Sequence, residues 1–156
     1  MKKFLSVLLV VLSMVAVFCS CKKDGGKTPA TNAVADAIKQ SAEFVELVEL
    51  TNDNITRRYF GIELEDIAEY TALVCSNGAN ADEIAVFKMK EKDDVEDMLE
   101  TVRERKQELY DSFVDYVPEE IGKIENAVIG SNGNYVYFIV CNNRAAAKAA
   151  AEDCFN

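Results

Sequence analysis

The segment SNGNYVYFIVC, residues 131–141, decides the fold class of this chain. Its Asn-Gly pair is a strong signal for the turn of a β-hairpin, and the β-branched and aromatic residues after it are typical of a strand. Together with the apolar stretch Ile124 to Ile129, it predicts a hairpin whose second strand is Tyr135 to Cys141. Both faces of that strand are apolar or aromatic, so we expect helices to cover both. The alternative is an exposed tyrosine face that serves as a docking surface.

A second hairpin is predicted earlier in the chain. Tyr70 to Cys75 and Glu83 to Met89 are dense in strand-forming residues, and Ser76-Asn77-Gly78-Ala79-Asn80 between them is typical of a hairpin connection. Between the two hairpins, Asp93 to Val117 places apolar residues at steps of three, four or seven. This spacing predicts a long amphipathic helix that ends at Pro118.

Shorter helices are predicted near both ends of the domain. Apolar residues recur at three- and four-residue steps from Val34 to Leu50, which indicates one or two short helices. Another short helix is predicted between Thr51, which suits an N-cap, and Gly61, which suits a helix end. The Ala-rich segment from Arg144 to about Cys154, preceded by the capping pair Asn142-Asn143, predicts a C-terminal helix.

These elements define an α+β fold. The expected architecture is an antiparallel four-stranded sheet made from two β-hairpins that are separated by the long amphipathic helix. The short N-terminal helices and the C-terminal Ala-rich helix are expected to pack on this sheet. Paired strands in this order argue against a parallel doubly wound fold, but they leave the order of the strands in the sheet open.

The first twenty residues have the anatomy of an export signal. Lys2 and Lys3 precede an apolar run from Phe4 to Phe18. This run is shorter than the roughly 20 residues that a membrane-spanning helix needs. The junction Phe18-Cys19-Ser20-Cys21 resembles the lipobox of bacterial lipoproteins, in which a small residue precedes a Cys that is acylated and becomes the new N-terminus.

The lipobox resemblance implies cleavage between Ser20 and Cys21 and lipidation of Cys21. Cys19 does not fit, because Phe18 would then occupy the place of the small residue. The alternative is an ordinary secretory signal cleaved nearby, which would release the protein. We therefore expect three regions: a cleaved lipoprotein signal peptide at 1–20, the lipidated Cys with a flexible tether at 21–32, and a single α+β domain at 33–156.

Composition narrows the classes of function. The 156 residues include 17 Lys and Arg against 27 Asp and Glu, and the net charge of −10 argues against a nucleic-acid binder. The chain has no His, which excludes the Ser-His-Asp triad, the Cys-His dyad, and zinc or haem held by His. It also lacks a Ca²⁺ loop of the Asp-x-Asp-x-Asp-Gly type. We predict no catalytic residue, no cofactor and no metal site.

Three cysteines lie within the domain. Cys75 and Cys141 fall on predicted strands and Cys154 near the C-terminus, and we expect all three to behave as small buried hydrophobic residues. One alternative is a reactive thiol. The other is a disulfide between Cys141 and Cys154 that would staple the last helix.

Carboxylate pairs are the other candidates for chemistry. Glu63 with Glu65, or Asp66 with Glu69, could in principle act as an acid and a base. That chemistry needs a cleft that holds two carboxyls at a set separation, which spacing along the chain does not provide. We expect the acidic stretches to be solvated surface.

Several stretches together resemble one known family: Phe44–Leu50, Arg58–Ile62, Ala81–Lys88, the charged helix after Lys92, Tyr116–Glu119 and Gly133–Val136. It is the domain-of-unknown-function family numbered 4358, whose members are small bacterial lipoproteins. The resemblance covers nearly the whole predicted domain. It implies a lipid anchor at Cys21 and no established activity, cofactor or catalytic residue.

The expected function is that of a non-enzymatic binding or accessory module of the cell envelope. A lipid anchor would hold it on the extracytoplasmic side of the cell membrane, where its partner is an envelope protein or a small ligand. The alternative is a lipid-tethered cell-wall-active or peptidase-like enzyme that uses carboxylates or a Cys. A concave pocket with converging titratable groups, or a thiol in a cleft beside Lys or Arg, would favour the enzyme.

Overall fold

The fold is built on one antiparallel sheet. A computed structural model describes residues 27–156, and its sheet has five strands in the order β1-β2-β3-β5-β4. All neighbouring strands are antiparallel. The strands are β1 Leu47–Glu49, β2 Ile67–Cys75, β3 Glu83–Met89, β4 Val128–Asn132 and β5 Tyr135–Val140. The α+β class and both hairpins are confirmed, whereas the predicted count of four strands is one too low.

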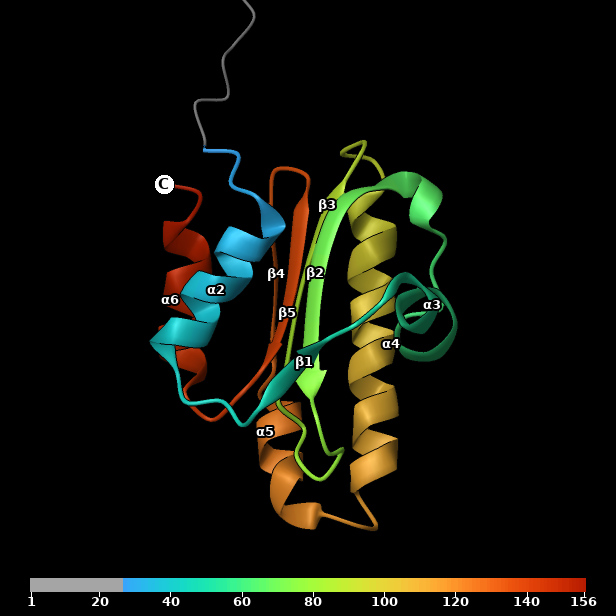
Figure 1. The fold of residues 1–156 in the computed structure, drawn as a ribbon, viewed down its shortest axis with the longest axis vertical. Helices are drawn as coiled ribbons and strands as arrows, with labels where there is room; N and C mark the ends of the chain where they lie inside the picture. Colours follow the sequence, from blue (N-terminus) through green and yellow to red (C-terminus); the bar gives the residue numbers. More distant parts are fainter. Residues whose placement is uncertain (1–26) are drawn as a thin grey trace, which may run out of the picture.

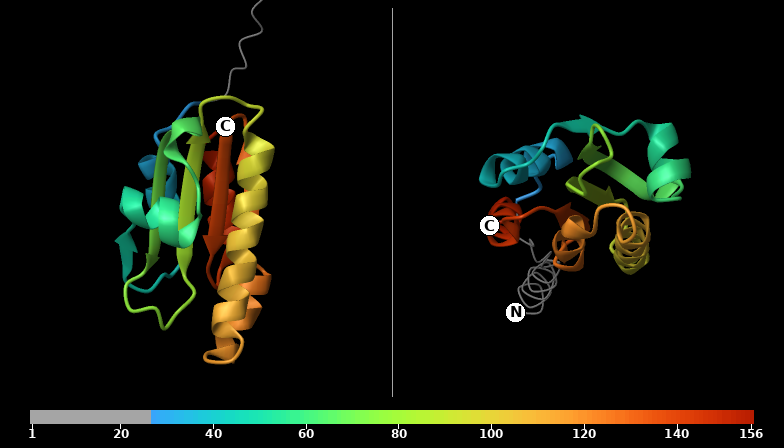
Figure 2. Two further views of the ribbon diagram at one scale, coloured as in Figure 1. Left: turned by 90° about the vertical axis from the view of Figure 1, so that its right-hand side faces the viewer. Right: turned by 90° about the horizontal axis from the view of Figure 1, so that it is seen from below.

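Helices cover both faces of this sheet. Figures 1 and 2 show α2 and α6 on one face and α4 with α5 on the other, so the domain has three layers. The helical elements are α2 Thr31–Ser41, α3 Asn52–Asn54, the π-helical turn η1 Ile55–Tyr59, η2 Leu64–Asp66, α4 Val95–Phe113, η3 Pro118–Glu120, α5 Ile121–Glu125 and α6 Arg144–Asp153. The predicted long helix and the Ala-rich helix correspond to α4 and α6.

Two segments differ from the prediction. The stretch before Leu50 was expected to be helical, but residues 47–49 form the edge strand β1 because they pair with the end of β2. Ile124 was expected to begin a strand, but it lies in α5 and is fully buried, and the strand begins only at Val128. In both segments the apolar spacing suits either a helix or a strand, and tertiary contacts decide between them.

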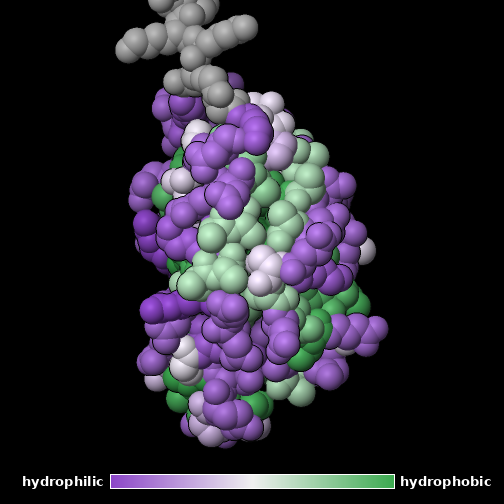
Figure 3. Space-filling model, turned by 90° about the vertical axis from the view of Figure 1, so that its left-hand side faces the viewer, coloured by the Kyte–Doolittle hydropathy of each residue, from purple (hydrophilic) through white to green (hydrophobic). Residues whose placement is uncertain are grey.

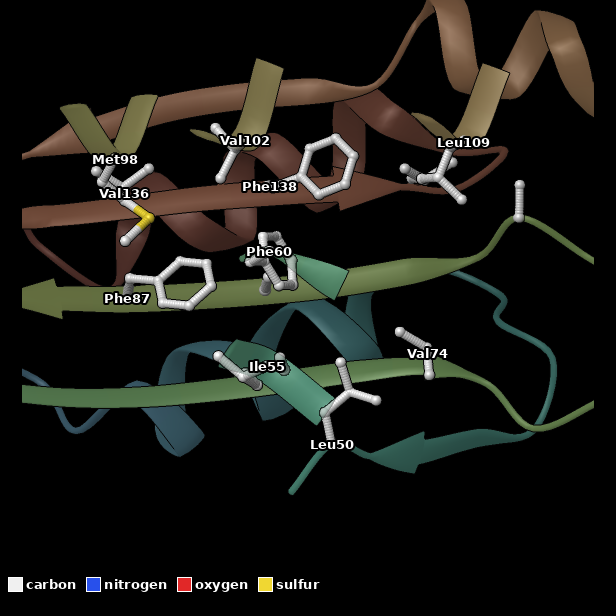
Figure 4. Packing of buried hydrophobic residues seen from close by; sticks show 14 of the residues in the cluster. Leu50, Ile55, Phe60, Val74, Phe87, Met98, Val102, Leu109, Val136 and Phe138 are labelled. Carbon is white, nitrogen blue, oxygen red and sulfur yellow. The ribbon is translucent and has the colours of Figure 1, made fainter. Parts of the chain in front are cut away.

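The larger part of the core lies between the sheet and α4. Phe87 of β3 and Phe138 of β5 are fully buried there. Figure 4 shows their rings directed toward the α4 side chains Met98, Val102 and Leu109. These three residues are spaced at four and seven, which places them on one face of the helix and explains why α4 packs along the whole sheet.

The opposite face of the sheet is covered by α2 and α6. Val34 and Ile38 of α2 and Ala147 and Ala151 of α6 are buried against β3 and β5, which confirms that both faces of the last strand are covered. Small Ala side chains let α6 lie close to its neighbours. Figure 3 shows the outer side of this layer, where a pale apolar strip runs between hydrophilic side chains.

The β4–β5 hairpin turns at Gly133, whose φ of +59° is readily adopted only by glycine. Further along the same hairpin, Gly130 lies opposite Tyr137 in the register. A Cβ atom at Gly130 would come within 2.4 Å of the Tyr137 ring, which is itself buried. The ring therefore occupies the space above this glycine.

Replacing Gly130 with Ala is expected to lower the free energy of unfolding by about 1–3 kcal/mol, because the buried Tyr137 ring must move. Thermal unfolding measures the effect. Gly122 is the matched control, because a Cβ there meets nothing within 4 Å, and its replacement by Ala should leave stability unchanged or raise it. Equal effects at the two glycines would contradict this explanation.

Candidate functional site

Two adjacent acidic residues at the start of β3 hold two buried cations. Asp82 precedes the strand and Glu83 is its first residue, and both are almost fully buried. Glu83 pairs with Arg105 of α4, and Asp82 pairs with Lys123 of α5. Buried charges are stable only when paired and hydrogen-bonded, so these contacts fix both helices to one end of the sheet.

The Arg105–Glu83 pair is bidentate. Arg105 Nη2 donates to Glu83 Oε2 at 2.8 Å and Nε donates to Oε1 at 3.2 Å, and only 11% and 2% of the two side chains are exposed. The guanidinium also lies 4.8 Å from the centre of the Tyr59 ring, a cation–π contact. Burial raises the pKa of Glu83, although Arg105 opposes this shift. Burial lowers the pKa of Arg105, but the Glu83 carboxylate raises it, and the net shift is upward.

Lys123 is the centre of a second cluster. Its Nζ donates to Asp82 Oδ1 at 2.8 Å and to Asn80 Oδ1 at 3.0 Å, and it lies 2.7 Å from Glu120 Oε2. The other carboxylate oxygen of Asp82 accepts from the backbone N–H of Val45 at 3.0 Å. This cluster therefore connects α5, the turn between β2 and β3, and the segment that leads into β1.

A cleft of about 310 Å³ opens beside these pairs, between η1, the end of β2 and the second half of α4. Its volume is at the lower end of the range for small-molecule sites. Its lining is partly apolar and partly charged: Arg58, Tyr59, Val74, Cys75, Gly78, Asn80, Ala81, Asp82, Glu83, Arg105, Leu109, Ser112 and Phe113. We call it the Arg105 cleft.

Cys75 lies in the Arg105 cleft together with two guanidinium groups, Arg58 and Arg105. A thiol in a cleft beside Arg is the feature that would favour the alternative of a lipid-tethered enzyme. The Cys75 Sγ lies 3.1 Å from Asn77 Oδ1, to which it donates, and Arg105 is bound to Glu83. Cys75 and Arg105 therefore both already have protein partners within the cleft.

The other two domain cysteines are also free thiols. Cys141 is buried, and burial raises the pKa of both Cys141 and Cys154. The alternative of a Cys141–Cys154 disulfide does not fit this structure, in which both thiols are free and α6 lies between the two residues. At 1.5 Å per residue the helix separates them by roughly 15 Å, whereas a disulfide needs Cα atoms within about 7 Å.

Neither of the two carboxylate pairs considered from the sequence has both its members in one cavity. Glu69 accepts hydrogen bonds from the backbone N–H and the hydroxyl of Thr31, so it stabilises the first turn of α2. Glu63 and Asp66 line a cavity of about 130 Å³ near the start of α4. Within residues 27–156, no group of three or more acidic, Cys or His side chains could hold a metal ion.

The residues of the predicted anchor, Ser20 and Cys21, lie outside the described part of the chain. Among the helices of residues 27–156, none combines the length and apolar character needed to cross a membrane.

Comparison with known proteins gives one match. A family model described as "Domain of unknown function (DUF4358)" matches residues 30–141, which includes the whole sheet and both buried ion pairs. No curated protein and no solved structure matches the chain.

Proposed function

The chain belongs to the family described as Domain of unknown function (DUF4358), and we propose that it is a lipid-anchored, extracytoplasmic binding or accessory module of the cell envelope. Cys21, preceded by the small residue Ser20 and an apolar run, would carry the lipid. One acyl chain binds a membrane only marginally, whereas the several chains of a lipoprotein hold it stably.

The geometry of the tether supports this proposal. The hydroxyl of Tyr135 donates to the backbone oxygen of Pro29 at 2.7 Å, which fixes where the tether meets the domain. Figure 1 places this point at one end of the sheet, and the Lys123 cluster near α5 at the other. An anchored domain would thus present the Arg105 cleft and the Lys123 cluster away from the membrane.

Charge supports the same orientation. The tether carries Lys22, Lys23 and Lys27, whereas residues 33–156 carry 12 basic against 26 acidic residues, a net charge of −14. Anionic headgroups attract the tether and repel the domain. The domain would therefore stand off the membrane surface, where a partner can reach it.

The main support for a non-enzymatic module is that the buried charged side chains are paired with one another. Among the described residues, no buried side-chain nitrogen or oxygen lacks a hydrogen-bond partner. Arg105 and Lys123 are each held by carboxylates of the protein itself. A catalytic acid, base or anion-stabilising group must be available to the substrate, and these cations are engaged elsewhere.

A lipid-tethered enzyme is the second candidate, and Cys75 is the residue that favours it. Its thiol lies in the Arg105 cleft and is half-buried, so a small substrate could reach it. A nucleophilic role would require activation by a neighbouring base or cation.

Labelling of intact cells with a membrane-impermeant maleimide tests the location and the role of Cys75 together. We expect Cys75 to be labelled without lysis, at a rate no greater than that of a small free thiol. Cys75→Ser and Cys154→Ser variants assign the label to each position. Labelling only after lysis would contradict the extracytoplasmic location. Labelling of Cys75 that is a hundredfold faster than that of the free thiol would instead support the enzyme.

A further inference from the structure

The strand β1 forms an open edge of the sheet. It pairs with β2 on one side and is the last strand in the order. Glu46 accepts from Ser76 of the β2–β3 turn at 3.0 Å, and Leu50 donates to β2 at 2.9 Å. Because backbone groups alternate in direction along an antiparallel strand, Leu47 and Glu49 point their N–H and C=O groups away from the sheet.

The side chains of this edge include exposed apolar groups. Val48 is 44% exposed and Val45 is 37% exposed. Val48 lies opposite Val74 in the register and so on the α4 face of the sheet, where Val74 is part of the core.

The same edge carries charge of one sign. Between Gln40 and Thr56 the sequence has four acidic residues and neither Lys nor Arg, and the four are exposed: Glu43, Glu46, Glu49 and Asp53. Charged side chains commonly protect edge strands from unwanted pairing, and at this edge all of those charges are acidic. A second copy of the strand would bring like charges together, whereas a strand with Lys or Arg would be attracted.

From these features we infer that β1 binds an extended basic peptide segment of a partner protein, which adds to the sheet as a sixth strand. The peptide backbone bonds to the outward groups of Leu47 and Glu49. Its apolar side chains pack on Val48 on the α4 face of the sheet, and its Lys or Arg side chains lie on the opposite face, near Glu49. This peptide would be the partner of the binding module proposed above. The inference rests on that proposed function, which places the domain in the cell envelope.

Fluorescence anisotropy tests the inference with the full-length chain purified in a non-ionic detergent. The probe is a labelled nine-residue peptide that alternates Lys with Val. We expect saturable binding that weakens as salt is added. Leu47→Pro, which removes an outward N–H, should weaken binding about tenfold or more, because one main-chain hydrogen bond is lost and the added strand cannot align. Circular dichroism checks that this variant is folded.

A second test needs no change in the protein. The same peptide with N-methyl groups at alternate residues cannot form the ladder on one side, so it should bind at least about tenfold more weakly. If the N-methylated and unmodified peptides bind equally, or neither binds, the inference is wrong.

Matched charge variants distinguish binding of the basic peptide at β1 from its non-specific attraction to the acidic surface of the protein. Glu46→Gln with Glu49→Gln should weaken binding of the Lys–Val peptide. Glu104→Gln with Glu119→Gln makes the same change in charge on exposed positions of other elements and should have little effect. Equal weakening by the two double variants would overturn the inference. It would leave the lipid-anchored location untouched, because maleimide labelling of cells tests that separately.

Discussion

Replacing Cys21 with Ala is expected to move the protein from the membrane fraction into the soluble fraction or the medium. In the proposed anchor, Cys21 carries the thioether lipid, because the small residue Ser20 precedes it as in a lipobox. We expect most of the protein to shift, because the proposed acyl chains are what hold it to the membrane, and separation of membranes from soluble protein measures the shift.

Cys19→Ala is the matched control for this prediction. Cys19 lies two residues before Cys21 and follows Phe18, which is too large for the position before the modified Cys. The Cys19→Ala variant should stay in the membrane fraction. Release of both variants, or of neither, would contradict the assignment of Cys21 as the anchor.

Replacing Arg105 with Met is expected to lower the free energy of unfolding by about 3–5 kcal/mol at neutral pH. The change removes both hydrogen bonds to Glu83 and leaves a carboxylate that is only 2% exposed without its cation. It also removes the contact with the Tyr59 ring. Denaturant unfolding of the wild type and the variant gives the difference.

The loss of stability in Arg105→Met should depend on pH. Burial raises the pKa of Glu83 in the folded protein, and the loss of Arg105 removes the group that opposes this shift. A carboxyl whose pKa is higher in the folded state favours folding when protonated, and this contribution is lost as pH rises through the folded-state pKa. The difference in free energy of unfolding between the wild type and Arg105→Met should therefore become smaller as pH falls through that pKa.

Arg103→Met provides the control on the same helix. Arg103 is half exposed and pairs with the exposed Glu96 and Glu100. Such surface pairs contribute about 0–1 kcal/mol, so this variant should be nearly as stable as the wild type. Equal losses in the two variants, or a deficit for Arg105→Met that does not change with pH, would show that the buried pair does not stabilise the domain in this way.

The sequence was sufficient to predict the elements whose signals are local. Asn132-Gly133 marks a turn because glycine adopts the required positive φ, and β4 and β5 pair directly on either side of that turn. The amphipathic period predicts α4, although the helix ends at Phe113 and not, as expected, at Pro118, which begins η3. Asn143 caps α6 through its side chain, as expected.

The edge strand β1 could not be predicted in the same way. Apolar residues from Phe44 to Leu50 recur at three- and four-residue steps, which suit a helix. The chain is extended there because the end of β2 offers a partner, and the pairing includes Val48 with Val74. That partner lies well over 20 residues away in sequence, and such pairing overrides local preference.

The buried ion pairs had no sequence signal. Arg105 lies 22 residues from Glu83, and Lys123 lies 41 residues from Asp82. In a chain rich in acidic side chains, neither carboxylate differs from its neighbours until the fold buries it. The Arg105 cleft is likewise assembled from η1, β2 and α4. The sequence singled out Cys75 but not the two guanidinium groups beside it.

We propose that lipid attached to Cys21 holds this domain outside the cell. Mass spectrometry of the N-terminal peptide of the protein isolated from its native membrane tests it most directly. We predict that the mature chain begins at Cys21 and carries a diacylglyceryl thioether and an N-acyl group. An unmodified N-terminus, at Cys21 or at any other residue, would contradict the claim.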